Sequence, residues 1–311
     1  MASPPIAAIV GPTASGKTDL ALAIARRQPV EILVADSRQV YRGMDLGTAK
    51  PDAAARAAVP HHLLDLVDPD EPFSVADWAE RARPLIPEVA ARDRLPLVVG
   101  GTGLYLSALV DGFDLPALAP APEVRRRLVD ELEASGLAPL AARLGELDPA
   151  AATMIDLRNP RRVLRALERI EAEGGGAVPP TRSTPYPGRL ALLGISRPRE
   201  VLRARIDARA TWLFVHGLLD EVRTLLDAGY GPELGPMTGH GYREAARVLA
   251  GEWDVERAIQ ITARHTRQYA KRQLTWFRRD ARILWLSAGD LPADDPQLVE
   301  QAVELIRRSI G

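Results

Sequence analysis

The sequence predicts an α/β fold in which helices flank a parallel sheet and an all-helical insertion interrupts the core. Two observations support this prediction. Short apolar runs alternate with helical segments over residues 1–115, and strand character returns only after residue 189. Buried parallel strands are nearly continuous apolar runs, and helical crossovers between them cover both faces of the sheet. We therefore expect a core from residues 1–115 and 189–311, with residues 116–188 as the insertion.

The first half of the core shows its elements clearly. We expect strands at Ile6–Val10, Glu31–Ala35 and Leu95–Val99, and a shorter one within His62–Val67. We also expect a helix over Ser74–Ala91. Its start is indicated by Ser74, a favourable N-cap residue that is followed three residues later by an acid. The insertion shows helix signals without convincing strands, between two proline-rich edges at 115–122 and 179–187.

The second half of the core is mostly helical. We expect strands at 190–195 and 282–286, and helices at 200–228, 255–277 and 297–308, with a glycine-rich loop at 229–241. Strands separated by helices again favour a parallel arrangement.

The composition excludes several classes of protein. With 46% apolar and 26% charged residues, the chain is an ordinary globular protein. It has no cysteine, which excludes disulfides, thiolate metal sites and cysteine nucleophiles. No charged leader precedes the first strand, and no apolar run is long enough to span a membrane. We expect a cytoplasmic monomer that makes no membrane contact.

The charges are unevenly distributed although the net charge is only −1. Residues 257–279 contain seven cations and no acid: Arg257, Arg264, Arg267, Lys271, Arg272, Arg278 and Arg279. Several recur at three, four and seven residues, on one side of a helix. One interpretation is a row of RNA phosphate contacts that includes Arg267 and Lys271. The alternative is a solvated arginine face, and the absence of acids favours RNA.

Lysine is rare in this chain. Only Lys17, Lys50 and Lys271 occur, against 37 arginines among 40 cations (40 − 3). A compact ammonium and a planar guanidinium are not interchangeable. The three lysines are therefore expected where arginine would not serve, although chance retention is the simpler alternative.

A phosphate-binding loop follows the first strand. Its residues fit the pattern G-x-x-x-x-G-K-[ST] completely: Gly11, Pro12, Thr13, Ala14, Ser15, Gly16, Lys17 and Thr18. A strand precedes the loop and a helix follows it, as the motif requires. Backbone amides and the helix N-terminus would bind phosphate, Lys17 would contact its oxygens, and Thr18 would hold Mg²⁺. The motif predicts a P-loop NTPase-like core that binds a di- or triphosphate, without saying which bond breaks.

Two polar residues are expected beside this loop. Asp36 follows the second strand and Thr102 follows the strand at 95–99. Ligands of open α/β sheets bind beyond the carboxyl ends of the strands, so these residues share an edge with the loop. Asp36 could act as a general base, or it could be a cap or an indirect partner of magnesium. Thr102 could orient an acceptor, or it could cap the next helix.

Several long segments resemble the tRNA dimethylallyltransferase family, the bacterial isopentenyltransferases that act on tRNA. They run in order from residue 11 to about 278: Asp36–Pro51, His61–Asp65, Gly100–Tyr105, Asn159–Glu168 and Thr266–Gln273. The resemblance thus covers nearly the whole chain. The loop before Gly241-Tyr242-Arg243-Glu244 departs from the family pattern, with His240 where a small aliphatic residue is expected.

The resemblance implies a reaction and its residues. The phosphate loop would hold the diphosphate of dimethylallyl diphosphate with Mg²⁺, and Arg209 would help to hold the leaving diphosphate. Asp36 would take a proton from the exocyclic amine of the adenosine 3′ of the anticodon, and Thr102 would position that amine. The tRNA anticodon stem-loop would contact Ser37, Arg38, Gln39, Arg125, Arg161, Arg162, Val163, Leu164, Arg165, Gly241, Tyr242 and Arg243, besides Asp36 and Thr102.

Three other functions compete with this one. A small-molecule kinase of the P-loop class would turn over ATP without RNA, and it would not need the basic helix or so large an insertion. An isopentenyltransferase acting on free adenine nucleotides would share the core but need no anticodon-binding insertion. A non-catalytic RNA-binding module would not need the complete phosphate loop together with Asp36.

Overall fold

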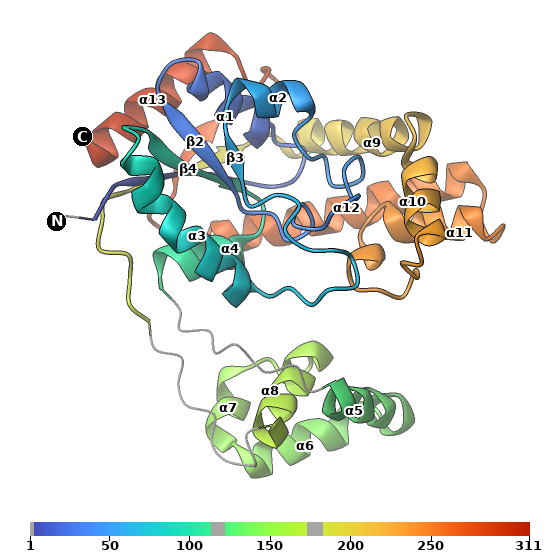
Figure 1. The fold of residues 1–311 in the computed structure, drawn as a ribbon. Helices are drawn as coiled ribbons and strands as arrows, with labels where there is room; N and C mark the ends of the chain where they lie inside the picture. The colour runs from blue at the N-terminus through green and yellow to red at the C-terminus, as the bar shows by residue number, and fades with distance from the viewer. Residues whose placement is uncertain (1–2, 113–121, 173–182) are drawn as a thin grey trace. The chain divides into compact units, whose positions relative to one another are not determined.

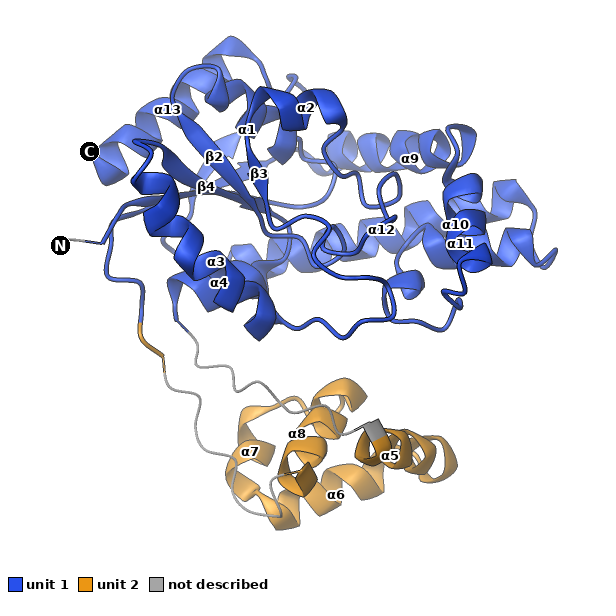
Figure 2. Cartoon of the chain, viewed as in Figure 1, with its two compact units in different colours: residues 1–112, 185–311 blue, residues 113–184 orange. Residues whose placement is uncertain are grey.

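The protein is made of two compact units. The structure is a computed structural model that describes residues 3–112, 122–172 and 183–311. Unit 1 comprises Met1–Gly112 and Pro185–Gly311, and unit 2 comprises Phe113–Thr184 (Figure 2). The boundaries expected from the sequence, after residues 115 and 188, fall three to four residues beyond the divisions between these units.

Unit 1 is built on a parallel sheet. The strands among the described residues are β1 (Ile6–Val10), β2 (Val30–Val34), β3 (His61–His62), β4 (Leu95–Gly100), β5 (Leu190–Ser196) and β6 (Leu284–Ser287). Their order is β3-β2-β4-β1-β5-β6, and every pairing is parallel. All five residues of β1 are buried, as expected for a central strand covered on both faces. The predicted α/β class with a P-loop NTPase-like core is confirmed.

Helices cover both faces of the sheet. In Figure 1, α1 (Lys17–Ala25) and α13 (Pro296–Ile310) lie above it, and α3 (Val75–Ala90) and α4 (Gly103–Val110) lie below it. The short helix α2 (Ala53–Ala58) precedes β3. Apolar residues of α1 and α13 form one buried cluster with the sheet. The predicted cap of α3 is present: Ser74 Oγ accepts a hydrogen bond from the Asp77 amide, and the Asp77 carboxylate accepts one from the Ser74 amide.

A second group of helices extends beyond the carboxyl edge of the sheet. It comprises α9 (Arg199–Val215), α10 (Leu218–Asp227), the 3₁₀ turn η1 (Pro236–Thr238), α11 (Tyr242–Leu249) and α12 (Val255–Phe277). Helices α9 and α12 pack against each other, and α11 packs on both α10 and α12. This group faces the loops that follow β1, β2 and β4.

Two sequence-based predictions of elements are wrong. The single helix expected over residues 200–228 is divided, because Gly217 adopts a φ of 109° and begins α10. The strand expected within 62–67 ends at His62, because Leu63 and Asp65 adopt positive φ angles of 68° and 53°. Left-handed backbone conformations of this kind do not continue a helix or a strand.

Unit 2 is helical throughout its described residues. Its helices are α5 (Pro122–Ser135), α6 (Leu137–Leu147), α7 (Pro149–Met154) and α8 (Pro160–Ala172). They enclose a separate apolar core that includes Leu128, Leu140, Leu144 and Leu167. A core of its own is the property that lets a segment fold as a unit.

The chain leaves unit 1 and returns to it at one place. The Tyr186 amide donates a hydrogen bond of 2.9 Å to the carbonyl of Val110, at the end of α4. The Tyr186 hydroxyl donates a second bond, of 2.6 Å, to the carbonyl of Pro4. The two chain crossings are thus fixed side by side. Among the described residues, no helix is long and apolar enough to span a membrane.

Candidate active site

The phosphate loop forms a tight turn between β1 and α1. Gly16 adopts a φ of 95° at the start of α1, and Ala14 a φ of 62°. The Lys17 ammonium folds back over the loop and donates a hydrogen bond of 2.8 Å to the carbonyl of Pro12. Residues of the loop line a cavity of about 910 Å³ together with Asp36 and Arg209. The turn and the helix N-terminus therefore face an open volume that suits a phosphate group.

Two arginines of α9 hold the loop from the side. Arg205 Nε donates a hydrogen bond of 2.9 Å to the carbonyl of Ala14, and Arg209 Nη1 lies 3.4 Å from Thr13 Oγ1. Burial lowers the pKa of Lys17 to about 8, and it also lowers that of the Arg209 guanidinium. Two desolvated cations beside an open cavity provide a strong site for an anion.

Asp36 and Thr102 meet at the carboxyl ends of β2 and β4. Thr102 Oγ1 accepts a hydrogen bond of 3.1 Å from the Ser37 amide, and Asp36 Oδ1 accepts one of 2.9 Å from the Arg38 amide. The Thr102 hydroxyl also interacts with the Tyr269 phenol, whose pKa is raised to about 12 by burial. The sheet topology therefore brings together the carboxylate and the hydroxyl singled out in the sequence. Thr102 is the N-cap residue of α4 but makes no side-chain cap.

Gln273 of α12 is a further residue of this site that sequence reasoning did not single out. Its Oε1 accepts a hydrogen bond of 2.8 Å from the Thr13 amide, and its Nε2 donates one of 2.8 Å to the carbonyl of Gly101. A Cβ on Gly101 would lie 2.2 Å from Gln273 Nε2, so a larger residue here would displace the Gln273 amide from its hydrogen bonds. The signal for Gln273 in the sequence is its place in the segment 266–273, which resembles the tRNA dimethylallyltransferase family.

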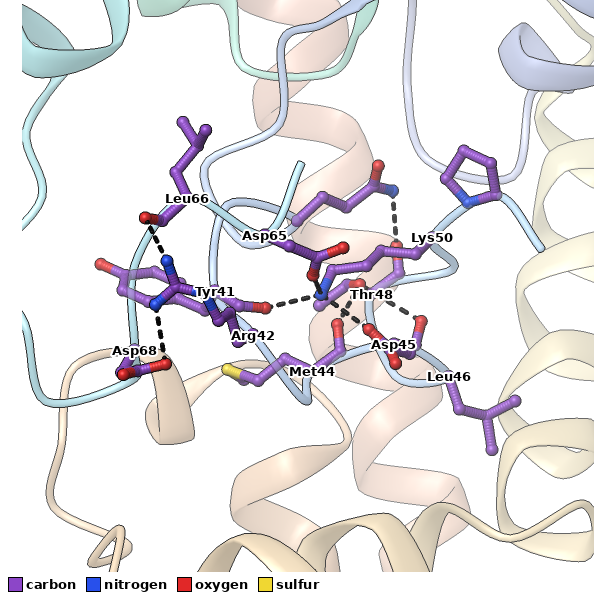
Figure 3. Close-up of polar contacts among 12 residues, drawn as sticks. Tyr41, Arg42, Met44, Asp45, Leu46, Thr48, Lys50, Asp65, Leu66 and Asp68 are labelled. Atoms are coloured by element: carbon purple, nitrogen blue, oxygen red, sulfur yellow. Dashed lines mark hydrogen bonds and ion pairs between the residues drawn. The ribbon is translucent and has the colours of Figure 1, made fainter. Parts of the chain in front are cut away.

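The segment after Asp36 is tied down by Lys50. The Lys50 ammonium is buried and donates to the carbonyl of Tyr41 (2.6 Å), to Asp45 Oδ1 (2.7 Å) and to Asp65 Oδ1 (2.5 Å), as Figure 3 shows. Gln39 Nε2 donates to the carbonyls of Thr48 and Ala49. These bonds close residues 39–50 into one loop. Gln39 is buried within it, which leaves Ser37 and Arg38 nearer the surface.

The same loop is held from outside by α10. The Glu221 carboxylate accepts hydrogen bonds from the amides of Asp45, Leu46 and Gly47, at 2.6–3.2 Å. It accepts a fourth from the hydroxyl of Tyr242, at 2.6 Å. The Glu221 carboxylate therefore joins the loop to α10 and to the start of α11.

The three lysines differ in their surroundings. Lys17 and Lys50 are buried and bonded to protein oxygens, in the crowded positions expected for a compact ammonium. Lys271 is exposed on α12. That arginine would not serve at Lys17 and Lys50 stays a prediction.

A second cavity, of about 230 Å³, adjoins the first. Thr13, Asp36, Arg209 and Tyr269 line both cavities. The second continues between α9 and α12 and is lined there by Ile206, Ala210, Leu213, His240, Tyr242, Thr262 and Thr266. Its rim includes Ser37 and Arg38. Asp36 therefore stands where the two volumes meet.

The residues expected to contact RNA fall into two groups. Arg161, Arg162 and Arg165 are exposed on one side of α8, and Arg125 is exposed while its guanidinium lies 2.9 Å from Glu168. The expectation for the side chains of Val163 and Leu164 needs correction, because both belong to the core of unit 2. They are the apolar positions of an amphipathic helix whose arginines at 161, 162 and 165 face solvent.

Several residues of α11 and α12 that were expected to contact RNA are bonded to other residues of the protein. Tyr242 is only 2% exposed, and its hydroxyl donates a hydrogen bond to Glu221. Arg243 Nη2 bonds the buried carboxylate of Glu244 at 3.0 Å and His265 at 2.9 Å. Arg267 forms an ion pair with Asp207 of α9. Lys271 and Arg264 remain exposed for contact with a partner.

A parallel sheet with a phosphate loop, two cations and a carboxylate at one edge is the arrangement of an enzyme active site. Comparison with known proteins gives the particular family. Residues 39–280 match the family model described as IPP transferase, and residues 4–59 match the model described as Isopentenyl transferase. The chain belongs to the IPP transferase family and is a prenyltransferase.

The relatives resemble the chain over nearly its full length. A "tRNA dimethylallyltransferase" of Roseiflexus sp. is 47% identical over 306 residues, which cover 98% of this chain and 99% of the relative. The protein of that name from Heliobacterium modesticaldum is 43% identical, with 97% and 95% covered. The solved tRNA isopentenylpyrophosphate transferase of Bacillus halodurans is 39% identical, with a TM-score of 0.71 and 98% and 97% of the two chains covered. A eukaryotic dimethylallyltransferase acting on tRNA is 26% identical, with a TM-score of 0.75 and 97% and 78% covered.

Proposed function

We propose that this protein transfers a dimethylallyl group from dimethylallyl diphosphate to the exocyclic amine of the adenosine 3′ of the anticodon in tRNA, releasing diphosphate. The observation that carries the proposal is the position of Asp36. It lines both the cavity over the phosphate loop and the adjoining cavity between α9 and α12. A donor held by its diphosphate in the first cavity and an acceptor in the second would meet beside this carboxylate.

The leaving group is the first chemical problem of this reaction. As the bond between the allylic carbon and the diphosphate oxygen breaks, negative charge grows on the diphosphate. Lys17 and Arg209 are the buried cations that would stabilise it, together with the amides of residues 11–18. Fixed charges aimed at developing charge often make the largest contribution to catalysis.

A magnesium ion would fit beside the diphosphate. The Thr18 hydroxyl lies at the start of α1 and lines the same cavity as Lys17 and Asp36. The described residues contain no group of three or more histidine and acidic side chains that could hold a metal alone. Mg²⁺ is commonly bound by few protein ligands, with substrate phosphates and water completing its shell. Once bound, it would neutralise further charge on the leaving diphosphate.

The acceptor amine must lose a proton as it forms the new bond to carbon. Asp36 would take that proton, which leaves the secondary amine neutral and completes the exchange of one C–O bond for one C–N bond. Thr102 would hold the amine from the other side, because its hydroxyl is fixed beside Asp36 by the Ser37 amide. A positioned base of this kind typically contributes about 10² to 10⁴ in rate.

The RNA would be held by exposed cations. Arg161, Arg162 and Arg165 on α8 and Lys271 on α12 are exposed, whereas Arg243 and Arg267 form ion pairs with acids of the protein. Contacts of these side chains with phosphates would position the anticodon stem-loop without reading its sequence. The target base would then swing out of the loop to reach Asp36, as enzymes that modify bases require.

The test is direct. The purified protein is incubated with Mg²⁺, unmodified tRNA and dimethylallyl diphosphate, and the nucleosides are analysed by mass. A prenyl increment on one adenosine of tRNA, with none on AMP, supports the proposal. Prenylation of AMP would instead assign the protein to the isopentenyltransferases of free nucleotides, and ATP turnover without any increment would indicate a kinase.

A further inference from the structure

Arg197 follows β5 directly and lies behind the phosphate loop. It is only 8% exposed. Its Nε donates a hydrogen bond of 2.8 Å to the carbonyl of Ser15. Its Nη1 donates to the carbonyls of Gly289, at 3.2 Å, and Leu291, at 2.8 Å. One buried guanidinium therefore joins the phosphate loop to the segment between β6 and α13.

The bond to Ser15 fixes the direction of the amide that follows. The carbonyl of Ser15 and the N–H of Gly16 belong to one peptide group, and the described residues contain no cis peptide bond. In a trans peptide group the C=O and the N–H point in opposite directions. Because Arg197 holds the carbonyl, the N–H of Gly16 points away from Arg197, and Gly16 lines the cavity over the phosphate loop. This amide is therefore held ready for an anion in the cavity.

The segment between β6 and α13 supports the loop from the same side as Arg197. A Cβ on Gly16 would lie 2.4 Å from the Cβ of Ala293 and 3.4 Å from Arg197 Nη2. Gly16 also adopts a φ of 95°, which residues with a side chain rarely adopt. The back of the loop is thus closely packed, so a change at Arg197 would be felt at the Gly16 amide.

Arg197 also places a positive charge behind the loop. The three groups that accept its hydrogen bonds are neutral carbonyls. Burial and the nearby Arg205 lower the pKa of the Arg197 guanidinium, while attraction by Asp19 and Asp290 opposes them. A buried cation is costly unless negative charge compensates it. A diphosphate on the other side of the loop would add to that compensation.

We infer that Arg197 is a positioning residue for the donor: it holds the Ser15–Gly16 peptide group with its N–H towards the diphosphate and adds positive charge behind it. The inference rests on the proposed function. Arg197 bonds the loop from the side of the Ser15 carbonyl, so it acts on the substrate through the loop. The phosphate-loop pattern covers residues 11–18 alone, whereas this role adds Arg197 and the carbonyls of Gly289 and Leu291 to the donor site.

The test compares arginines at the two ends of β5. Arg197→Lys, Arg197→Gln and Arg197→Met are prepared, with Arg189→Met as the matched control. Arg189 precedes β5 and donates a hydrogen bond to the carbonyl of Gly311 after α13, so its loss removes a similar link far from the phosphate loop. The Kd of inorganic diphosphate is measured by calorimetry with Mg²⁺. The KM values for dimethylallyl diphosphate and for tRNA are measured by prenyl transfer, and folding is checked by thermal unfolding.

The inference predicts a loss that is confined to the donor. Arg197→Met should raise the Kd of diphosphate and the KM for dimethylallyl diphosphate by about 10- to 100-fold, the effect of one hydrogen bond from a charged group. The KM for tRNA should stay close to that of the wild type. Arg197→Lys should recover most of the affinity because it keeps the charge and a donor, and Arg197→Gln, which keeps only a donor, should recover less. Arg189→Met should bind diphosphate as the wild type does.

Other results would overturn it. If Arg197→Met binds diphosphate as tightly as the wild type, Arg197 does not position the donor. If the KM for tRNA rises as much as that for the donor, or if Arg189→Met shows the same loss, Arg197 only maintains the fold. Should Arg197→Met not fold, equal affinities of Arg197→Lys and Arg197→Gln for diphosphate would exclude a role of the charge. A wild type that binds diphosphate but does not prenylate tRNA would instead reject the proposed function.

Discussion

The side-chain oxygen of Gln273 lies 2.8 Å from the backbone nitrogen of Thr13, although 260 positions separate the two residues in the sequence. The nitrogen of the same amide donates to the carbonyl of Gly101. One side chain from α12 thus joins the phosphate loop after β1 to the turn after β4. The mutual position of these two loops depends on this amide.

Replacing Gln273 with methionine should therefore destabilise the protein. The substitution keeps the shape of the side chain but leaves a buried N–H and a buried carbonyl without partners, each costing about 1 to 3 kcal/mol. We expect the free energy of unfolding, measured in urea, to fall by about 2 to 4 kcal/mol. Gln268→Met, at an exposed position of the same helix, is the control. Equal stability of the two variants would mean that the bridge contributes nothing.

Asp36→Ala should separate catalysis from binding. Without the base, prenyl transfer should fall by about 10² to 10⁴. The affinity for tRNA, measured by filter binding, should stay close to that of the wild type, because phosphate contacts supply most of it. A variant that loses its affinity along with its activity would show that Asp36 acts in binding or in folding.

Binding of inorganic diphosphate should depend on the protonation of Lys17. Burial lowers the pKa of Lys17 to about 8, so the free protein loses this charge as pH rises through that value. The affinity should then fall by up to about tenfold per pH unit, and binding at pH 9 should take up a proton. Calorimetry in buffers of different ionisation enthalpy measures both effects. Lys17→Met gives the pH dependence of the affinity that is due to the protonation of diphosphate itself. An identical pH dependence in the wild type would contradict the prediction.

Lys50→Met should loosen the loop at residues 39–50. Among the described residues, the variant leaves Asp65 with Arg56 as its one ion-pair partner, and it removes the donor to the carbonyl of Tyr41. Breaking a fully buried pair costs about 3 to 5 kcal/mol, and the partial exposure of Asp65 reduces this to about 2 to 3 kcal/mol. Chemical denaturation measures the loss. Arg56→Met removes the other, more exposed cation and should lower the free energy of unfolding by less. A larger loss in Arg56→Met than in Lys50→Met would show that Lys50 is not the main residue holding the loop.

Glu31 should make the protein sensitive to acid. Hydrogen bonds from Arg92, together with one from His62, lower the pKa of this carboxyl from 4.5 to about 2. Because the folded state favours the ionised form, the stabilisation is complete above pH 4.5 and is lost as pH falls from there towards 2. Thermal unfolding of the wild type and of Glu31→Gln should therefore converge over this range. A constant difference between them would exclude Glu31 as the source.

The parts of the site that depend on local backbone were predictable from the sequence. The phosphate loop is defined by eight consecutive residues, and Asp36 and Thr102 could be placed beside it because parallel strands end at one edge of the sheet. Gln273 and Glu221 could not be found in this way, because their roles come from packing of α12 and α10 against loops more than 170 positions away.

The errors have equally specific causes. His216 and Gly217 interrupt an otherwise helical pattern, and one glycine in a helical run is weak evidence for a break. Val163 and Leu164 stand beside arginines in the motif, whereas the periodicity of α8 directs their side chains into the core of unit 2.

The bond between the Tyr186 amide and the Val110 carbonyl makes unit 2 a replaceable module. Segments inserted between two adjacent points of a domain can be lengthened, exchanged or removed in evolution without altering the pairing of the strands that carry them. A change within unit 2 therefore leaves the strands of the sheet and the loops at their carboxyl edge in place. The junction at Val110 and Tyr186 is the place to graft a foreign recognition unit onto this enzyme.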